Sequence, residues 1–105
     1  MPRYLTLIKF TDQGLKSIDK TTQRAAAFCQ TVEAAGGQME SQYWALGRFD
    51  GTAIFRVPSD EDAAAVLVAL GKLGNVHTQT TQLFDAEEFG RIVAKANKPA
   101  RRARR

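Results

Sequence analysis

The chain has 105 residues, 44% of them hydrophobic and 25% charged, which is the composition of one ordinary globular domain. No apolar run approaches the roughly 20 residues that a membrane-spanning helix requires, and we expect no membrane association. The single cysteine, Cys29, excludes an internal disulfide and predicts a reducing, cytoplasmic location.

The net charge of +4 comes from the C-terminus. Five basic residues and no acidic residue lie in 98–105, so residues 1–97 have a net charge of −1. We therefore predict a domain over 1–97 and a basic, disordered tail over 98–105. The charge of this tail attracts nucleic acid nonspecifically, or it only keeps the terminus solvated. The candidate anion-binding residues of the tail are Lys98, Arg101, Arg102, Arg104 and Arg105.

The first third of the chain predicts a strand, a turn and a helix. Residues 3–10, "RYLTLIKF", are apolar on both faces of an extended chain. The block "TDQG" follows as a turn. Its loop motif comprises Thr11, Asp12 and Gly14. Apolar residues at helical spacing then predict a helix over about 21–35, with Thr21 as its N-cap and Gly36 at its end.

The rest of the chain predicts three more strands and two more helices. The expected elements are strands at 38–46, 52–57 and 75–84 and helices at about 60–72 and 86–97. Asp50 and Gly51 favour a tight hairpin between the first two of these strands. Ser59 and Asp85 have the side chains of helix N-caps. The last helix is expected to direct its apolar residues into the core.

This order of elements, β-α-β-β-α-β with an additional C-terminal helix, predicts an α+β, ferredoxin-like domain. Its four-stranded antiparallel sheet has helices on one face, and strand 75–84 lies at an edge. The neighbours Tyr43 and Trp44 point to opposite faces of their strand. Because the helices cover only one face, we expect the other to be buried by a second copy of the chain, in a homodimer or a larger homo-oligomer.

Three blocks of the sequence, "YLTLIKFTDQG", "YWALGRFDGTAIF" and "LGKLGNVHTQTTQLF", resemble the GYD-domain family over about residues 3–95. The Gly-Tyr-Asp signature of that family falls on Gly47, Phe49 and Asp50, with phenylalanine in place of tyrosine. Packing and turn roles survive this replacement, whereas a role for the phenol hydroxyl does not. The resemblance implies a member of the dimeric α/β-barrel superfamily.

A second likeness concerns small-molecule binding. The hairpin and the block "LGNVHTQT" are similar to the effector-binding domain of leucine-responsive bacterial regulators. That likeness implies a sheet dimer that binds small molecules near its subunit interface. The chain has no room for the helix-turn-helix domain of those regulators.

Two polar residues are the main candidates for chemistry. Asp50 either binds a ligand amine or main chain near an interface, or makes its turn by bonding its own backbone. His77, the only histidine, either transfers protons in a small wet pocket or belongs to a polar edge strand that is open to water. Cys29 lies on the apolar stripe of its helix and is expected to act as a small hydrophobic residue.

We expect a non-enzymatic small-ligand-binding or interaction module that acts as a homo-oligomer. The candidate ligand-binding residues are Tyr43, Trp44, Gly47, Phe49, Asp50, Asn75, His77 and Thr78. The alternative implied by the resemblance is a small cofactor-free enzyme of monooxygenase or isomerase type, using His77, Trp44 and Asn75. A third interpretation is a nucleic-acid-associated protein that acts through its arginine-rich tail. We expect no cofactor, and no metal site, because one cysteine and one histidine fall short of a structural zinc site.

Overall fold

Four strands and four α-helices make up the structure, a computed structural model that describes residues 1–98. The elements are β1 (Arg3–Phe10), α1 (Asp12–Lys16), the 3₁₀ turn η1 (Ile18–Lys20), α2 (Thr21–Ala34), β2 (Gln38–Trp44), β3 (Gly51–Arg56), α3 (Asp60–Lys72), β4 (Val76–Leu83) and α4 (Ala86–Ala96). The predicted order of elements is confirmed. Residues 99–105 lie outside the described part, and with them Arg101, Arg102, Arg104 and Arg105 of the predicted tail.

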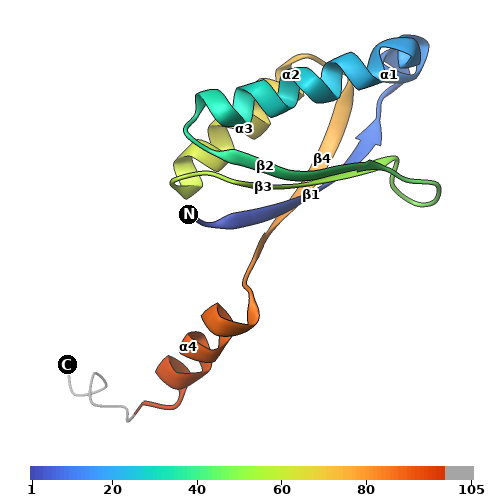
Figure 1. Cartoon of the computed structure of the whole chain (residues 1–105). Helices are drawn as coiled ribbons and strands as arrows, with labels where there is room; N and C mark the ends of the chain where they lie inside the picture. Colours follow the sequence, from blue (N-terminus) through green and yellow to red (C-terminus); the bar gives the residue numbers. More distant parts are fainter. Residues whose placement is uncertain (99–105) are drawn as a thin grey trace.

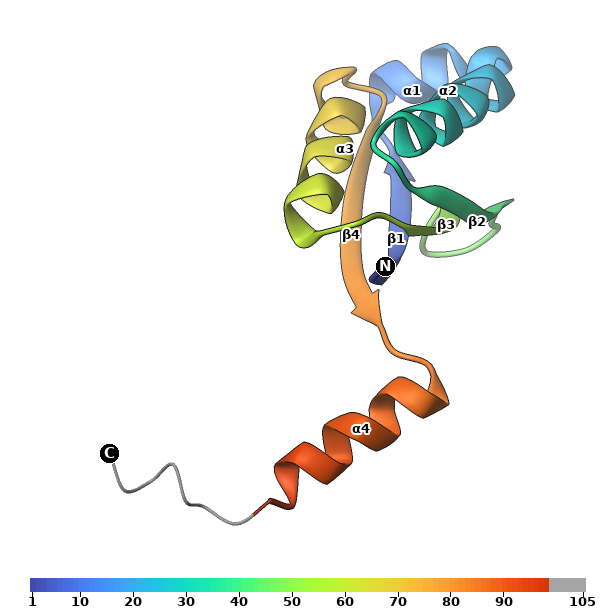
Figure 2. The same cartoon turned by 60° about the vertical axis from the view of Figure 1, so that its left-hand side comes forward.

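The strands form one antiparallel sheet in the order β2-β3-β1-β4. β1 is central, with Tyr4 opposite Phe55 of β3 and Gln82 of β4. Helices α1, α2 and α3 lie on one face, which we call the inner face, and no described helix covers the outer face (Figures 1 and 2). The ferredoxin-like fold is therefore confirmed, with β4 at an edge as expected.

The core lies between the inner face and the helices and is centred on Phe55. Its ring stacks on Tyr4 at a centroid distance of 5.6 Å and meets Phe28 of α2 edge-on at 5.8 Å. Its remaining buried hydrophobic residues are Val32, Ala53, Val57, Ala63 and Val66. Strand alternation explains the sheet residues of the core, because alternate residues of β1 and β3 face the helices. Val32 comes from α2, and Ala63 and Val66 come from α3.

Two polar groups at this core are paired by hydrogen bonds. The buried Thr6 hydroxyl accepts a hydrogen bond from Thr80 of β4 at 2.9 Å. The Tyr4 hydroxyl donates to the carboxylate of Asp60 in the first turn of α3. Burial, together with the Asp60 carboxylate, raises the pKa of Tyr4 to about 12. The phenol therefore stays neutral and joins the central strand to a helix.

The helix ends predicted from sequence are mostly confirmed. Gly36 follows α2 with a φ of +85°, a conformation that glycine adopts without steric cost. The Ser59 side chain accepts from the backbone N–H of Asp62, and Asp85 forms a capping box with Glu88. The predicted Thr21 cap is wrong, because η1 leads directly into α2 and Thr21 is the first helical residue.

Two further predictions are wrong. The connection between β2 and β3 is the six-residue loop 45–50, not a tight hairpin, because Trp44 already pairs with Gly51. Helix α4 does not pack on the core of its own chain, since it buries none of its residues. Both views show it standing away from the sheet and the other helices (Figures 1 and 2). Its apolar residues Ile92 and Val93 are 37% and 45% exposed.

The predicted loop motif docks on the turn between α3 and β4. The backbone N–H of Thr11 donates to the Asn75 carbonyl at 3.0 Å, and the Thr11 hydroxyl donates to the Gly74 carbonyl at 2.7 Å. Gly14 packs so closely that an added Cβ would lie 2.1 Å from the Asn75 carbonyl oxygen. Asp12 is exposed in the first turn of α1. The motif therefore joins two blocks of sequence that are about 60 residues apart.

We predict that Gly14→Ala destabilises the protein by roughly 1–3 kcal/mol, because the new methyl group has to displace backbone. Gly71→Ala on α3 is the matched control, since a Cβ there meets nothing within 4 Å. Helix propensity alone favours alanine by about 0.8–1.0 kcal/mol at either position. Urea unfolding of the three proteins measures the difference. Equal effects of the two substitutions would contradict the close approach at Gly14.

Candidate functional site

A pocket of about 180 Å³ lies between the inner face of the sheet and helices α2 and α3; we call it the inner pocket. Its apolar lining includes Ile8, Phe10, Phe28, Trp44, Leu70, Leu73 and Val76. Its polar side chains include Thr21, Arg24, Thr31, Gln42 and Asn75. An apolar wall with a few polar groups is typical of small-molecule sites.

Trp44 reaches the inner pocket because of a β-bulge in β2. The pairing with β3 shifts between Met39 and Ser41, so Glu40 is an extra residue that reverses the alternation of the strand. Trp44 therefore turns inward, where its indole N–H donates to the Thr21 hydroxyl at 3.0 Å. The indole remains 49% exposed and forms a wall between the pocket and solvent.

Arg24 is the positively charged residue in the described lining of the inner pocket. Its Nη1 donates to the carbonyl and the hydroxyl of Ser17 at 2.8 and 3.0 Å, and its Nη2 donates to the Gly14 carbonyl at 3.3 Å. These bonds hold the end of α1 and η1 against α2. Arg24 forms no ion pair within residues 1–98.

Sequence reasoning missed four of these polar residues as parts of a site, three on α2 and one on β2: Thr21, Arg24, Thr31 and Gln42. The Gln42 amide donates to the Ala25 carbonyl at 2.9 Å, which ties β2 to α2 beside the pocket. A signal for Arg24 existed, because it lies three residues after Thr21 and four before the buried Phe28, on one face of a helix. An arginine on an otherwise apolar helical face is the pattern to look for.

The predicted aromatic and strand residues divide between the two faces of the sheet. Trp44 and Asn75 line the inner pocket, and alternation places Thr78 on the inner face as well. Tyr43 and His77 direct their side chains to the outer face, although the backbone of Tyr43 contributes to the pocket edge. The structure therefore does not bring His77 together with Trp44 and Asn75.

The signature residues lie in the loop 45–50 and at its end. Gly47 is exposed, and Phe49 is half-buried with the Arg48 guanidinium 5.8 Å from its ring. The Asp50 carboxylate does not bond its own turn. It accepts from the backbone N–H of Phe10 at 2.8 Å and lies 3.7 Å from the Lys9 ammonium. Asp50 thus fastens the loop to the end of β1.

Cys29 is not part of the inner pocket. Its thiol lies 3.7 Å from the Glu33 carboxylate, and burial together with that carboxylate raises the pKa of Cys29. A raised pKa leaves less of the nucleophilic thiolate at neutral pH. Among residues 1–98, no three His, Cys, Asp or Glu side chains come together in a way that could hold a metal ion.

The outer face of the sheet is a second surface of interest. Its apolar side chains include Leu5, Leu7, Tyr43, Ile54 and Leu83. Tyr43 is 68% exposed, although tyrosine rings are usually at least half-covered in folded proteins. His77 lies on this face opposite Lys9.

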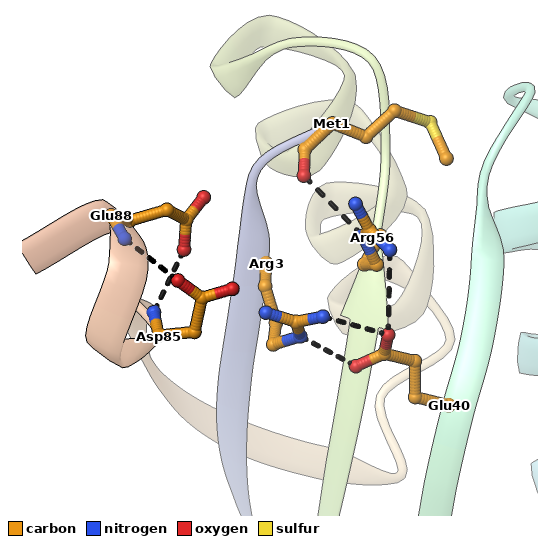
Figure 3. A network of polar contacts seen from close by, with 6 residues as sticks. All are labelled: Met1, Arg3, Glu40, Arg56, Asp85 and Glu88. Atoms are coloured by element: carbon orange, nitrogen blue, oxygen red, sulfur yellow. Dashed lines mark hydrogen bonds and ion pairs between the residues drawn. The ribbon is translucent and has the colours of Figure 1, made fainter.

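One end of the outer face carries a polar network (Figure 3). Arg3 binds Glu40 through two hydrogen bonds of 2.7 and 3.2 Å, and Arg56 lies 3.8 Å from the same carboxylate. This pairing lowers the pKa of Glu40 and keeps it ionised. Asp85 and Glu88, which form the capping box of α4, lie beside Arg3 in the same view. The network therefore marks the point where α4 leaves the sheet.

Comparisons with known proteins agree with the fold. A family model described as the GYD domain matches residues 4–93. The crystal structure of TTHA0845 from Thermus thermophilus is similar in fold, with a TM-score of 0.53 and 22% sequence identity. The match covers 82% of this chain and 96% of that chain. No curated protein matches the sequence.

We predict that Asp50→Ala destabilises the protein by roughly 1–3 kcal/mol, because the Phe10 N–H loses its charged acceptor. Asp50→Asn keeps an acceptor oxygen and loses only the exposed Lys9 contact, so we expect a loss of less than about 1 kcal/mol. Urea unfolding compares the two variants with the wild type. If Asp50→Ala is as stable as the wild type, the carboxylate does not hold the loop.

Proposed function

We propose that this chain, which belongs to the GYD domain family, is a non-enzymatic module that binds one small ligand in its inner pocket and acts as a homodimer. The observation that carries the proposal is the pocket itself, an apolar space of about 180 Å³ beside a half-exposed tryptophan. A cavity of roughly 150 Å³ is enough to bind benzene. The expected ligand is therefore a molecule with a single ring or a short branched chain.

The composition of the pocket lining supports binding over catalysis. Within residues 1–98, its side chains include no Asp, Glu, His, Cys or Lys that could accept or donate a proton near neutral pH. His77, the candidate base of the enzyme alternative, lies on the outer face. A cofactor-free enzyme would therefore have to use a solvent molecule or the ligand itself for proton transfer.

The homodimer is supported by two apolar surfaces that residues 1–98 leave uncovered. The outer face carries Leu7 and Ile54 near its centre, and α4 carries Phe89 and Ile92, which are 53% and 37% exposed. Standard interfaces bury about 1,200–2,000 Å² of surface. A second copy that packs sheet against sheet would cover the outer face and give the dimeric α/β-barrel arrangement expected from the resemblance.

Two remaining expectations stay proposals. The lone thiol of Cys29 supports a cytoplasmic location. Attraction of nucleic acid to the arginine-rich terminus is supported only by the charge of 98–105. None of the helices within residues 1–98 is long and apolar enough to cross a membrane.

The ligand-binding proposal predicts that a larger side chain in the pocket blocks binding. Ala25 of α2 lines the pocket, and Ala26 beside it does not. Trp44, the only tryptophan, reports occupancy by its fluorescence. Benzyl alcohol is expected to change the emission of the wild type and of Ala26→Leu in a saturable way, and Ala25→Leu is expected to bind at least about tenfold more weakly, a loss of about 1.4 kcal/mol or more. Equal binding by both variants would place the ligand elsewhere.

The homodimer predicts that a charge at the centre of the outer face separates the subunits. Ile54→Glu is expected to weaken dimerisation at least about a hundredfold, because the interface would bury an unpaired carboxylate. Ala64→Glu, on the exposed side of α3, is the matched control and is expected to remain dimeric. Light scattering from about 100 μM to about 0.1 μM protein measures the mass, since association is linked to concentration. A folded wild-type monomer at micromolar concentration would disprove the dimer.

A further inference from the structure

We infer that the ligand of the inner pocket is a small organic anion, an apolar body with one carboxylate or similarly charged oxygen group, and that Arg24 is the residue that binds this charge. The inference rests on the proposed function and specifies its ligand. Two observations support it: Arg24 has no carboxylate partner among residues 1–98, whereas the cations along the sheet have one, and a second hydrogen-bond donor lies beside it.

Arg24 differs from the other cations that lie along the sheet. Arg3 and Arg56 share the Glu40 carboxylate, and Lys9 lies beside Asp50. Within residues 1–98, Arg24 has only neutral acceptors, which are two carbonyls and one hydroxyl of the α1 end. The part of the pocket lining that the structure describes includes no carboxylate. An unneutralised positive charge thus lines a mostly apolar pocket whose other polar side chains are neutral.

The hydrogen bonds of Arg24 leave room for a ligand. A guanidinium has five N–H groups, and the three bonds to Ser17 and Gly14 use Nη1 twice and Nη2 once. The Nε–H and one Nη2–H have no acceptor within residues 1–98. The Nε–H and the Nη2–H next to it form one edge of a guanidinium, an arrangement that binds the two oxygens of a carboxylate.

A second donor lies beside Arg24. The Thr21 oxygen accepts from the Trp44 indole, so the hydroxyl hydrogen of Thr21 is free to point toward a ligand oxygen. Thr21 and Arg24 are three residues apart on α2 and therefore share a face. The aromatic walls at Phe10 and Trp44 then accommodate the apolar body. Charge recognition within low-dielectric walls is stronger than the same contact in water.

Benzoate and benzamide test the inference, because they match in shape and differ in charge. Titrations at pH 7.5 follow Trp44 fluorescence. We expect the wild type to bind benzoate at least about tenfold more tightly than benzamide, as a charged hydrogen-bonded pair implies. Arg24→Gln is expected to reduce this ratio to about twofold or less, and Arg24→Lys to restore part of it. Arg48→Gln, in the exposed loop, is expected to keep the wild-type ratio.

The outcomes separate the inference from the proposed function and from a purely structural role. If wild-type protein binds benzamide as well as benzoate, the pocket is a ligand site and the anion inference is wrong. If Arg24→Gln weakens both ligands equally, Arg24 only holds α1 in place, and the inference is again wrong. If neither ligand nor benzyl alcohol binds, the proposed function fails. Thermal unfolding of each variant records the contribution of Arg24 to stability separately from its contribution to binding.

Discussion

The extra residue in β2 determines what each face of the sheet can do. Without the bulge at Glu40, simple alternation from the inward Met39 would turn Tyr43 toward the helices and Trp44 outward. The bulge reverses that order, so the indole closes the inner pocket and the phenol ring joins the outer face. Glu40 itself turns outward, where Arg3 and Arg56 bind it. One irregular residue thus determines both the Trp44 wall of the inner pocket and the position of Tyr43 on the outer face.

The sequence predicted most of the fold because local signals and periodicity agreed. Ser59 and Asp85 have side chains that accept from the third residue of their helices, and Gly36 can adopt a positive φ, so three boundaries followed from local chemistry. The apolar pattern of residues 3–10 correctly predicted a strand, and the order of elements correctly predicted β4 at an edge of the sheet. The tight hairpin was wrong because Asp50 bonds β1, which is 40 residues away in sequence, and local turn preferences contain no information about that contact.

The candidate site was less predictable than the fold. Its side chains come from several helices and strands, and which side of each element faces the pocket depends on how these elements pack. Trp44 and Asn75 were expected, but the inward direction of Trp44 required the bulge, which leaves no clear mark in the sequence. Arg24 was missed since its role appears only when α1, α2 and the sheet are assembled. His77 had two alternatives, a wet pocket or a polar edge strand open to water, and the register opposite Lys9 places it, exposed, on the outer face of the edge strand β4. The enzyme alternative that the resemblance implied used His77, Trp44 and Asn75, which the structure does not bring together.

The inner pocket and the outer face are built on the same strands and are separated by the thickness of one sheet. On β1, Ile8 lines the pocket and Leu7 faces outward, so neighbouring residues serve different surfaces. A homodimer that covered the outer face would hold these strands from the side opposite the inner pocket. Helix α4 follows directly from β4, the strand that contributes both Val76 to the pocket and His77 to the outer face. A partner subunit that covered the exposed apolar side of α4 would therefore also hold β4, the edge strand that contributes to the inner pocket.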